Sequence, residues 1–194
     1  EKFVISYAGN MGAPQGLEIL IEAARILREE EDIHFFMMGD GTERAPLMKL
    51  AKGYNLRNVT FLSYQPYSLM AEAYAAVDAS FVSQAPGTSN DGIPSKVYRI
   101  MACARPVIAC TDLHSDLARM IEESGGGVFV LSGSAEALAD AILQAYNQRD
   151  AWKEKGLKAR QFIEQKYARA SISDQYHKLI MSSLRNGCGH KGME

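Results

Sequence analysis

Apolar residues follow two alternating patterns along the chain. Short uninterrupted runs rich in β-branched and aromatic residues predict buried strands, whereas longer stretches with apolar residues every three or four positions predict helices. The predicted strands are FVISYAG, IHFFMMG, NVTFL, ASFVS, PVIA and GVFVL. The predicted helices cover about residues 17–27, 69–76, 116–121 and 134–146, and another follows Pro94 directly. Strand and helix therefore alternate over most of the chain.

This alternation predicts the fold class. Continuous apolar strands separated by helices are typical of a parallel sheet with helices on both faces, because each crossover places its helix against one face. We therefore expect an α/β fold with a doubly wound, Rossmann-like parallel sheet. In such sheets ligands bind at the carboxyl ends of the strands, near the point where the strand order reverses. The loops that follow the strands are the candidate sites.

The strand pattern stops after Asp150, and two further helices are predicted at about 152–167 and 172–184. In the last helix, Tyr176, Leu179, Ile180 and Leu184 form one apolar stripe, which needs a partner surface on this domain or on another. Residues 187–194 have no periodicity and are predicted to be a flexible tail. The chain is thus expected to be one domain at 1–186, with extra C-terminal helices, followed by that tail.

Composition narrows the classes of partner and compartment. The 194 residues are 47% hydrophobic and 23% charged, with a formal net charge of −2, so no broad basic field is available for nucleic acid or an anionic membrane. Apolar runs such as FFMM are far shorter than the roughly 20 residues that span a bilayer. Three scattered cysteines and no export signal predict a cytoplasmic protein with reduced thiols. The chain begins without methionine and almost at once in a strand, so we expect that an upstream part is absent.

The loop after the first predicted strand, AGNMGAPQG, is rich in glycine. Gly9 and Gly12, with Asn10 and Gln15 beside them, would let a phosphate approach the backbone N–H groups ahead of the next helix. Their spacing matches neither the dinucleotide fingerprint nor the P-loop, which disfavours NAD. A turn that merely joins strand to helix would explain the glycines as well.

Two further loops offer contacts of other kinds. Gly39 and Asp40, after the second strand, could border a ligand, and a tight turn explains them about as well. The backbone of the loop after the third strand, with Ser63, Tyr64 and Gln65, could offer hydrogen bonds to a flat base. Tyr64 or Tyr67 could stack on that base, although two tyrosines near a loop are more often simple packing.

The loop after the fourth strand has the strongest chemical signal. In DGIPSK, Pro94 fits the first turn of the following helix, and the free N–H groups there can bind an anion together with Ser95 and Lys96. A solvent-facing lysine on a capped helix is the alternative, but the position at the carboxyl end of a strand argues against it. Four scattered histidines form no metal-ligand pattern, so no metal site is expected.

Six motifs in order resemble one family. YAGNMGAPQGLEILIEAA, HFFMMGDGTER, NVTFLSYQP, AAVDASFVS, GIPSKVYRIMACARPVIA and GGGVFV look like the C-terminal, nucleotide-sugar-binding half of a family 4 glycosyltransferase of the GT-B fold, and in particular like bacterial members that build surface polysaccharides and O-antigens. The resemblance extends from about Phe3 to Leu184. It implies a Rossmann-like half that holds a nucleoside-diphosphate sugar, most often a UDP-sugar, and a missing N-terminal half that holds the acceptor.

The resemblance also implies roles. It implies transfer with retention of anomeric configuration, without a metal or other cofactor, to a glycan or lipid-linked acceptor. Membrane association at the inner face, through the missing half, is left open, and the isolated domain is expected to turn over little substrate. The implied catalytic residues are Lys96 and Asp91. The implied donor-binding residues are Gly9, Asn10, Gly12, Gln15, Gly39, Asp40, Ser63, Tyr64, Gln65, Gly92, Ile93, Pro94, Ser95, Lys96 and Arg99.

Two positions depart from the family pattern. Many members have glutamates where Asp91 and Arg99 stand, the second on the ribose hydroxyls, and a guanidinium cannot accept those hydrogens. Many members also have a lysine in place of Gln15, which leaves Lys96 as the main phosphate cation. Two other interpretations stay open, a sugar-nucleotide epimerase of the same fold and a non-catalytic nucleotide-sugar-binding module.

Overall fold

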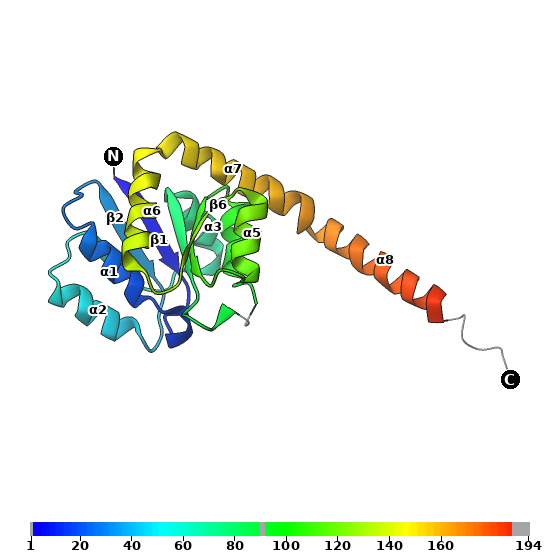
Figure 1. Cartoon of the computed structure of the whole chain (residues 1–194), viewed down its shortest axis with the longest axis horizontal. Helices are drawn as coiled ribbons and strands as arrows, with labels where there is room; N and C mark the ends of the chain where they lie inside the picture. The colour runs from blue at the N-terminus through cyan, green and yellow to red at the C-terminus, as the bar shows by residue number, and fades with distance from the viewer. Residues whose placement is uncertain (1, 90–91, 188–194) are drawn as a thin grey trace.

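A single parallel sheet organises the domain. The computed structural model describes residues 2–89 and 92–187, and its six strands lie in the order β3-β2-β1-β4-β5-β6. All neighbouring strands pair in parallel, for example Phe3 of β1 beside Ile33 of β2 and Ser80 of β4 beside Val107 of β5. The predicted doubly wound α/β fold is confirmed (Figure 1).

The elements fall close to their predicted positions. The strands are β1 Phe3–Ala8, β2 Ile33–Met38, β3 Val59–Leu62, β4 Ala79–Ser83, β5 Val107–Thr111 and β6 Gly127–Leu131. The helices are α1 Glu18–Ile26, α2 Arg44–Gly53, α3 Met70–Ala75, α4 Lys96–Ala102, α5 Asp116–Ser124, α6 Ala135–Asn147, α7 Arg149–Lys166 and α8 Arg169–Gly187. Short 3-10 helices, η1 Ala13–Gln15 and η2 Tyr67–Leu69, precede α1 and α3.

Apolar side chains cover both faces of the sheet, as the continuous strands predict. On one face, Ile5 and Phe35 pack against the buried residues of α1 and α6. On the other, Val82 and Val107 pack against buried residues of α4, α5 and α7. Each fully buried aliphatic side chain of this kind contributes about 1.5–3 kcal/mol relative to an exposed one. The two faces therefore hold β1 and β4 rigidly, and with them the loops at their carboxyl ends.

The strand order reverses between β1 and β4. The chain runs outward from β1 through β2 to β3, returns to place β4 on the other side of β1, and then runs outward again to β6. The loops that leave the carboxyl ends of β1 and β4 turn to opposite sides, which opens a crevice between them. This is the point at which the loops singled out in the sequence meet.

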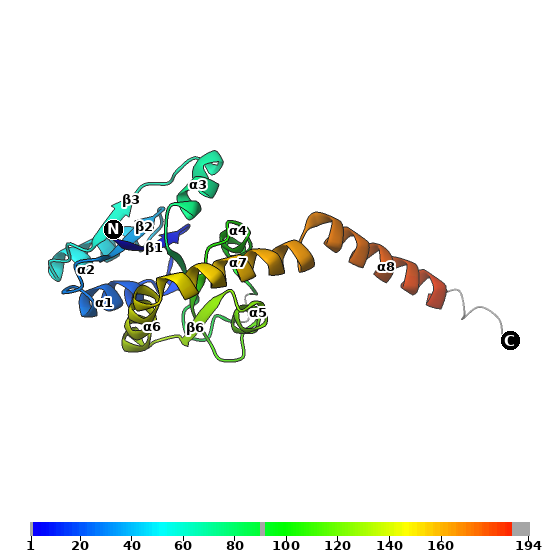
Figure 2. The same cartoon turned by 90° about the horizontal axis from the view of Figure 1, so that it is seen from above.

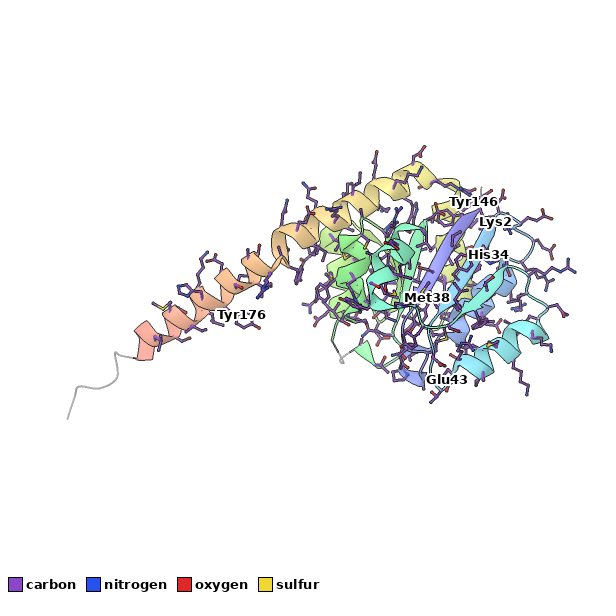
Figure 3. All side chains as sticks on the ribbon, turned by 180° about the vertical axis from the view of Figure 1, so that it is seen from behind. Lys2, His34, Met38, Glu43, Tyr146 and Tyr176 are labelled. Atoms are coloured by element: carbon purple, nitrogen blue, oxygen red, sulfur yellow. The ribbon has the colours of Figure 1, made fainter. Side chains whose placement is uncertain are left out.

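The last helix, α8, projects away from the sheet in both views (Figures 1 and 2). Its apolar stripe is solvent-exposed, with Tyr176 64%, Leu179 62%, Ile180 56% and Leu184 63% accessible. Tyr176 is labelled on this helix, far from the sheet, in Figure 3. The stripe thus finds no partner surface on residues 2–89 and 92–187.

Two boundaries differ from the prediction. The last helix begins earlier than expected, at Arg169, and includes Gly187, which was assigned to the tail. The rest of the predicted tail, 188–194, lies outside the described residues. Within those residues no helix combines the length and the apolar character needed to cross a membrane.

Candidate functional site

Lys96 lies in the crevice between β1 and β4. It is the first residue of α4, and its Nζ is 3.9 Å from the centroid of the Tyr7 ring, near the end of β1. The Tyr7 ring is fully buried, so the ammonium group rests on a rigid aromatic face. Gly9 makes this approach possible, because a Cβ there would be 2.8 Å from Lys96 Nζ and its φ is +140°.

The loops after β1 and β2 are held together by their backbones. The N–H of Gly9 donates to the carbonyl of Met38 at 2.9 Å, and the N–H of Met11 donates to that of Asp40 at 2.7 Å. Gly39 lies so close that a Cβ on it would be 1.9 Å from the carbonyl oxygen of Gly9. The hydroxyl of Tyr7 donates to the carbonyl of Asn10. These contacts fix the strand end on which Lys96 rests.

Beside this strand end is a cavity of about 240 Å³, here called the tyrosine cavity. It is lined by Ala8, Gly9, Met38, Tyr64, Gln65, Tyr67, Met70, Tyr74 and Arg99. Arg99 lies one helical turn after Lys96, and its Cζ is 5.4 Å from the centroid of the Tyr67 ring. Among the described residues, the cavity combines aromatic faces with the cation of Arg99.

A second cavity, of about 200 Å³, is here called the lysine cavity. It is lined by Pro14, Gln15, Ser83, Gln84, Thr88, Gly92, Pro94 and Lys96. The Gln84 amide donates to the carbonyl of Gly92 at 3.0 Å and accepts from the Thr111 hydroxyl at 2.8 Å. This buried chain of hydrogen bonds ties the loop before α4 to β5.

The electrostatics of the crevice are positive. Burial, together with the nearby charge of Arg99, lowers the pKa of Lys96 to about 8. In the described part of the chain, no carboxylate lies within 4.0 Å of Lys96 Nζ, and neither cavity is lined by Asp or Glu. A half-buried ammonium group that lacks a carboxylate partner is a site for an anionic ligand.

Most of the predicted donor-binding residues gather around this crevice. Gly9, Tyr64, Gln65 and Arg99 line the tyrosine cavity, and Gln15, Gly92, Pro94 and Lys96 line the lysine cavity. Asn10, Gly12, Gly39, Asp40, Ser63, Ile93 and Ser95 line neither cavity. Asp91, the predicted second catalytic residue, lies outside the described residues.

Several of the residues that line neither cavity support the loops instead. Gly12 donates its N–H to Gln15 Oε1 at 3.0 Å, so the Gln15 amide is partly engaged within its own loop. Ile93 packs against the core around α4, and Ser95 is exposed.

The position of Pro94 differs from the prediction. It was expected within the first turn of the helix, but α4 begins at Lys96, and the Pro94 carbonyl accepts the N–H of Val97 at 3.0 Å.

Among the residues of the crevice that were not predicted, Tyr7, Tyr74 and Gln84 contribute aromatic or polar contacts. Tyr7 and Tyr74 resemble core residues in the sequence, and their contributions depend on contacts with Lys96 and the tyrosine cavity that only the fold creates. Gln84 did carry a signal, because it is a polar residue directly after a fully buried strand, at the carboxyl end of the sheet.

In 2–89 and 92–187, no three His, Cys, Asp or Glu side chains are grouped so that they could hold a metal ion.

Comparisons with known proteins give the family. The family model described as glycosyl transferases group 1 matches residues 2–148. A colanic acid biosynthesis glycosyl transferase named WcaI, from Escherichia coli K12, is 36% identical over 145 residues, which cover 74% of this chain and 35% of the relative. A poly(ribitol-phosphate) alpha-N-acetylglucosaminyltransferase of Staphylococcus aureus is 25% identical over 92% of this chain and 35% of its own length. The chain spans about a third of the length of these curated relatives.

Solved structures share the fold. The Anabaena protein HepE, crystallised with UDP, has a TM-score of 0.81 at 20% identity, over 93% of this chain and 49% of its own. TarM of S. aureus, crystallised with UDP among other ligands, has a TM-score of 0.79 at 22% identity, over 92% of this chain and 35% of its own. At such identities the likeness supports the architecture of the domain alone.

Proposed function

The chain belongs to the glycosyl transferases group 1 family, and from this premise we propose that it is the donor-binding domain of a retaining glycosyltransferase. The donor is a nucleoside-diphosphate sugar, with UDP as the preferred nucleotide. The sugar passes to a glycan or lipid-linked acceptor held by another domain, in the biosynthesis of a bacterial polysaccharide. The named activities of the family members and the UDP in the HepE and TarM crystals support this assignment.

One observation carries the proposal, namely the position of Lys96 between two cavities. Lys96 lines the lysine cavity, and its Nζ would be 2.8 Å from a Cβ added to Gly9, which lines the tyrosine cavity. Each cavity is smaller than the ~300–1,000 Å³ usual for a small-molecule site, so a ligand the size of a sugar nucleotide has to occupy both. We assign the base and ribose to the tyrosine cavity, the diphosphate to Lys96, and the sugar to the lysine cavity.

This arrangement suggests how the domain contributes to transfer. When the bond from the anomeric carbon to the diphosphate breaks, negative charge develops on the departing phosphate oxygens. Lys96 is already in place to stabilise that charge, since the Tyr7 ring and the sheet hold it, and Arg99 adds positive charge close enough to interact with Lys96. The acceptor and its binding groups belong to another domain.

The first test is a calorimetric titration of the chain with UDP, GDP and ADP. We expect saturable binding of UDP and weaker binding of the other two, since one base should fit the tyrosine cavity best. No binding of any of the three at millimolar concentration would contradict the assignment.

The pKa of Lys96 predicts how binding depends on pH. The group is charged below about pH 8 and neutral above it in the free protein. Because only the ammonium form attracts a diphosphate, UDP affinity should fall by about tenfold between pH 7 and 9, and binding near pH 8 should take up protons. Calorimetry in buffers of different ionisation enthalpy measures this uptake. The Lys96→Ala variant controls for titration of the ligand, and an uptake that persists in it would contradict the prediction.

A further inference from the structure

Among the residues that the structure describes, none that lines the tyrosine cavity carries a carboxylate, the strongest hydrogen-bond acceptor among side chains. In the part of the chain that the structure describes, Arg99 is the charged residue among those that line it. The remaining side-chain acceptors are neutral, namely the hydroxyls of Tyr64, Tyr67 and Tyr74 and the amide oxygen of Gln65. Its walls otherwise consist of aromatic rings, methionine side chains and the end of β1.

Arg99 contributes donors and positive charge to this cavity. Its guanidinium group lies over the Tyr67 ring, with the Cζ 5.4 Å from the ring centroid, and it makes no salt bridge with the described residues. It is close enough to Lys96 for the two charges to interact. A guanidinium group has five N–H donors and no acceptor. Arg99 is therefore suited to phosphate or carbonyl oxygens and unsuited to receiving a hydroxyl hydrogen.

The hydroxyls of a ribose are hydrogen-bond donors as well as acceptors. A site with strong selectivity for ribose offers these hydroxyls a carboxylate, because a charged acceptor makes a hydrogen bond roughly twice as strong as a neutral one. The described side chains that line the tyrosine cavity offer neutral acceptors, each of which can also bond to water. Removal of the 2′-hydroxyl from a bound nucleotide should therefore cost little affinity.

We propose that this site does not select ribose, so that its donor class includes sugars carried on 2′-deoxyribonucleoside diphosphates as well as on ribonucleoside diphosphates. Arg99 is the specificity-determining residue. It presents only hydrogen-bond donors at the cavity wall, whereas a carboxylate there would accept the hydrogens of the ribose hydroxyls. This inference rests on the proposed function, because it concerns the nucleoside of that donor.

The test compares the affinities of the chain for UDP, dUDP and dTDP by calorimetry. We expect the UDP and dUDP affinities to agree within about fivefold, as for the loss of one neutral hydrogen bond, and dTDP to bind also. A preference for UDP greater than this overturns the inference and leaves the proposed function intact. Failure of all three to bind overturns the proposed function, and the inference with it.

Substitution of Arg99 tests its role directly. Arg99→Glu supplies a carboxylate, so the ratio of UDP to dUDP affinity should rise to about tenfold or more even though both nucleotides bind more weakly. Arg99→Gln is the matched control, because it removes the charge without adding a carboxylate and should leave the ratio unchanged. An unchanged ratio in Arg99→Glu would overturn the specificity role of Arg99.

Discussion

Replacement of Lys96 by alanine is expected to weaken UDP binding by about 1.5–3 kcal/mol, or roughly 10- to 150-fold. The ammonium group lies between the two cavities and has no carboxylate partner among residues 2–89 and 92–187, so a diphosphate would provide its counter-charge. Loss of a charged hydrogen bond to phosphate has an effect of this size. Calorimetric titration with UDP at pH 7 measures it.

The same substitution should not lower the unfolding temperature. Burial lowers the pKa of Lys96, which means that the fold disfavours the charged side chain relative to the unfolded chain. Alanine relieves that cost and loses mainly the contact with the Tyr7 ring. Lys52→Ala, at an exposed position near the end of α2, is the matched control and should change neither affinity nor stability. Unchanged UDP affinity in Lys96→Ala would remove the basis for the donor site, whereas joint loss of binding and stability would assign Lys96 a structural role.

The sequence predicts the fold well because local pattern and tertiary environment agree. β4 and β5 are buried along their whole length, and their short, mostly apolar sequences without charged residues fit a buried strand. Ser115 and Ser134 cap α5 and α6 through side-chain hydrogen bonds, which explains why both helices begin close to where the pattern places them. The apolar stripe of α8 was also predicted, and its exposure in the structure favours the second of the two expected partners, a surface on another domain.

The site is harder to predict because its parts come from different strands. The sequence indicates that the loops of Gly9 and Lys96 follow strands, but it does not indicate that Tyr7 lies beneath the lysine, since that contact depends on β1 and β4 being neighbours. Tyr74 is similar, because a buried tyrosine on a helix resembles any core residue until the cavity beside it is seen. Gly39 was predicted either to border a ligand or to form a tight turn, and the sequence did not indicate its close backbone approach to Gly9.

That close approach predicts the largest effect on stability. Gly39→Ala would place a Cβ 1.9 Å from the carbonyl oxygen of Gly9, at a φ of +140° that only glycine adopts readily. Backbone strain and steric overlap each cost about 1–3 kcal/mol, so we expect the unfolding temperature to fall by roughly 5–20 °C. The displaced Gly9 would also move the strand end on which Lys96 rests, so UDP binding should be lost. Thermal unfolding and UDP titration measure the two effects.

Two other glycines separate the causes of that loss. Gly87 has a φ of +79°, and a Cβ added to it would meet no atom within 4 Å, so Gly87→Ala should show the cost of backbone strain alone, about 1 kcal/mol. Gly53, at the end of α2, has open space and no positive φ, and Gly53→Ala should be neutral or stabilising by up to about 1 kcal/mol. If Gly39→Ala destabilises no more than Gly87→Ala, the loops after β1 and β2 can separate without cost. The inference that this strand end supports Lys96 rigidly would then be wrong, because one added methyl group would displace the strand end at little cost.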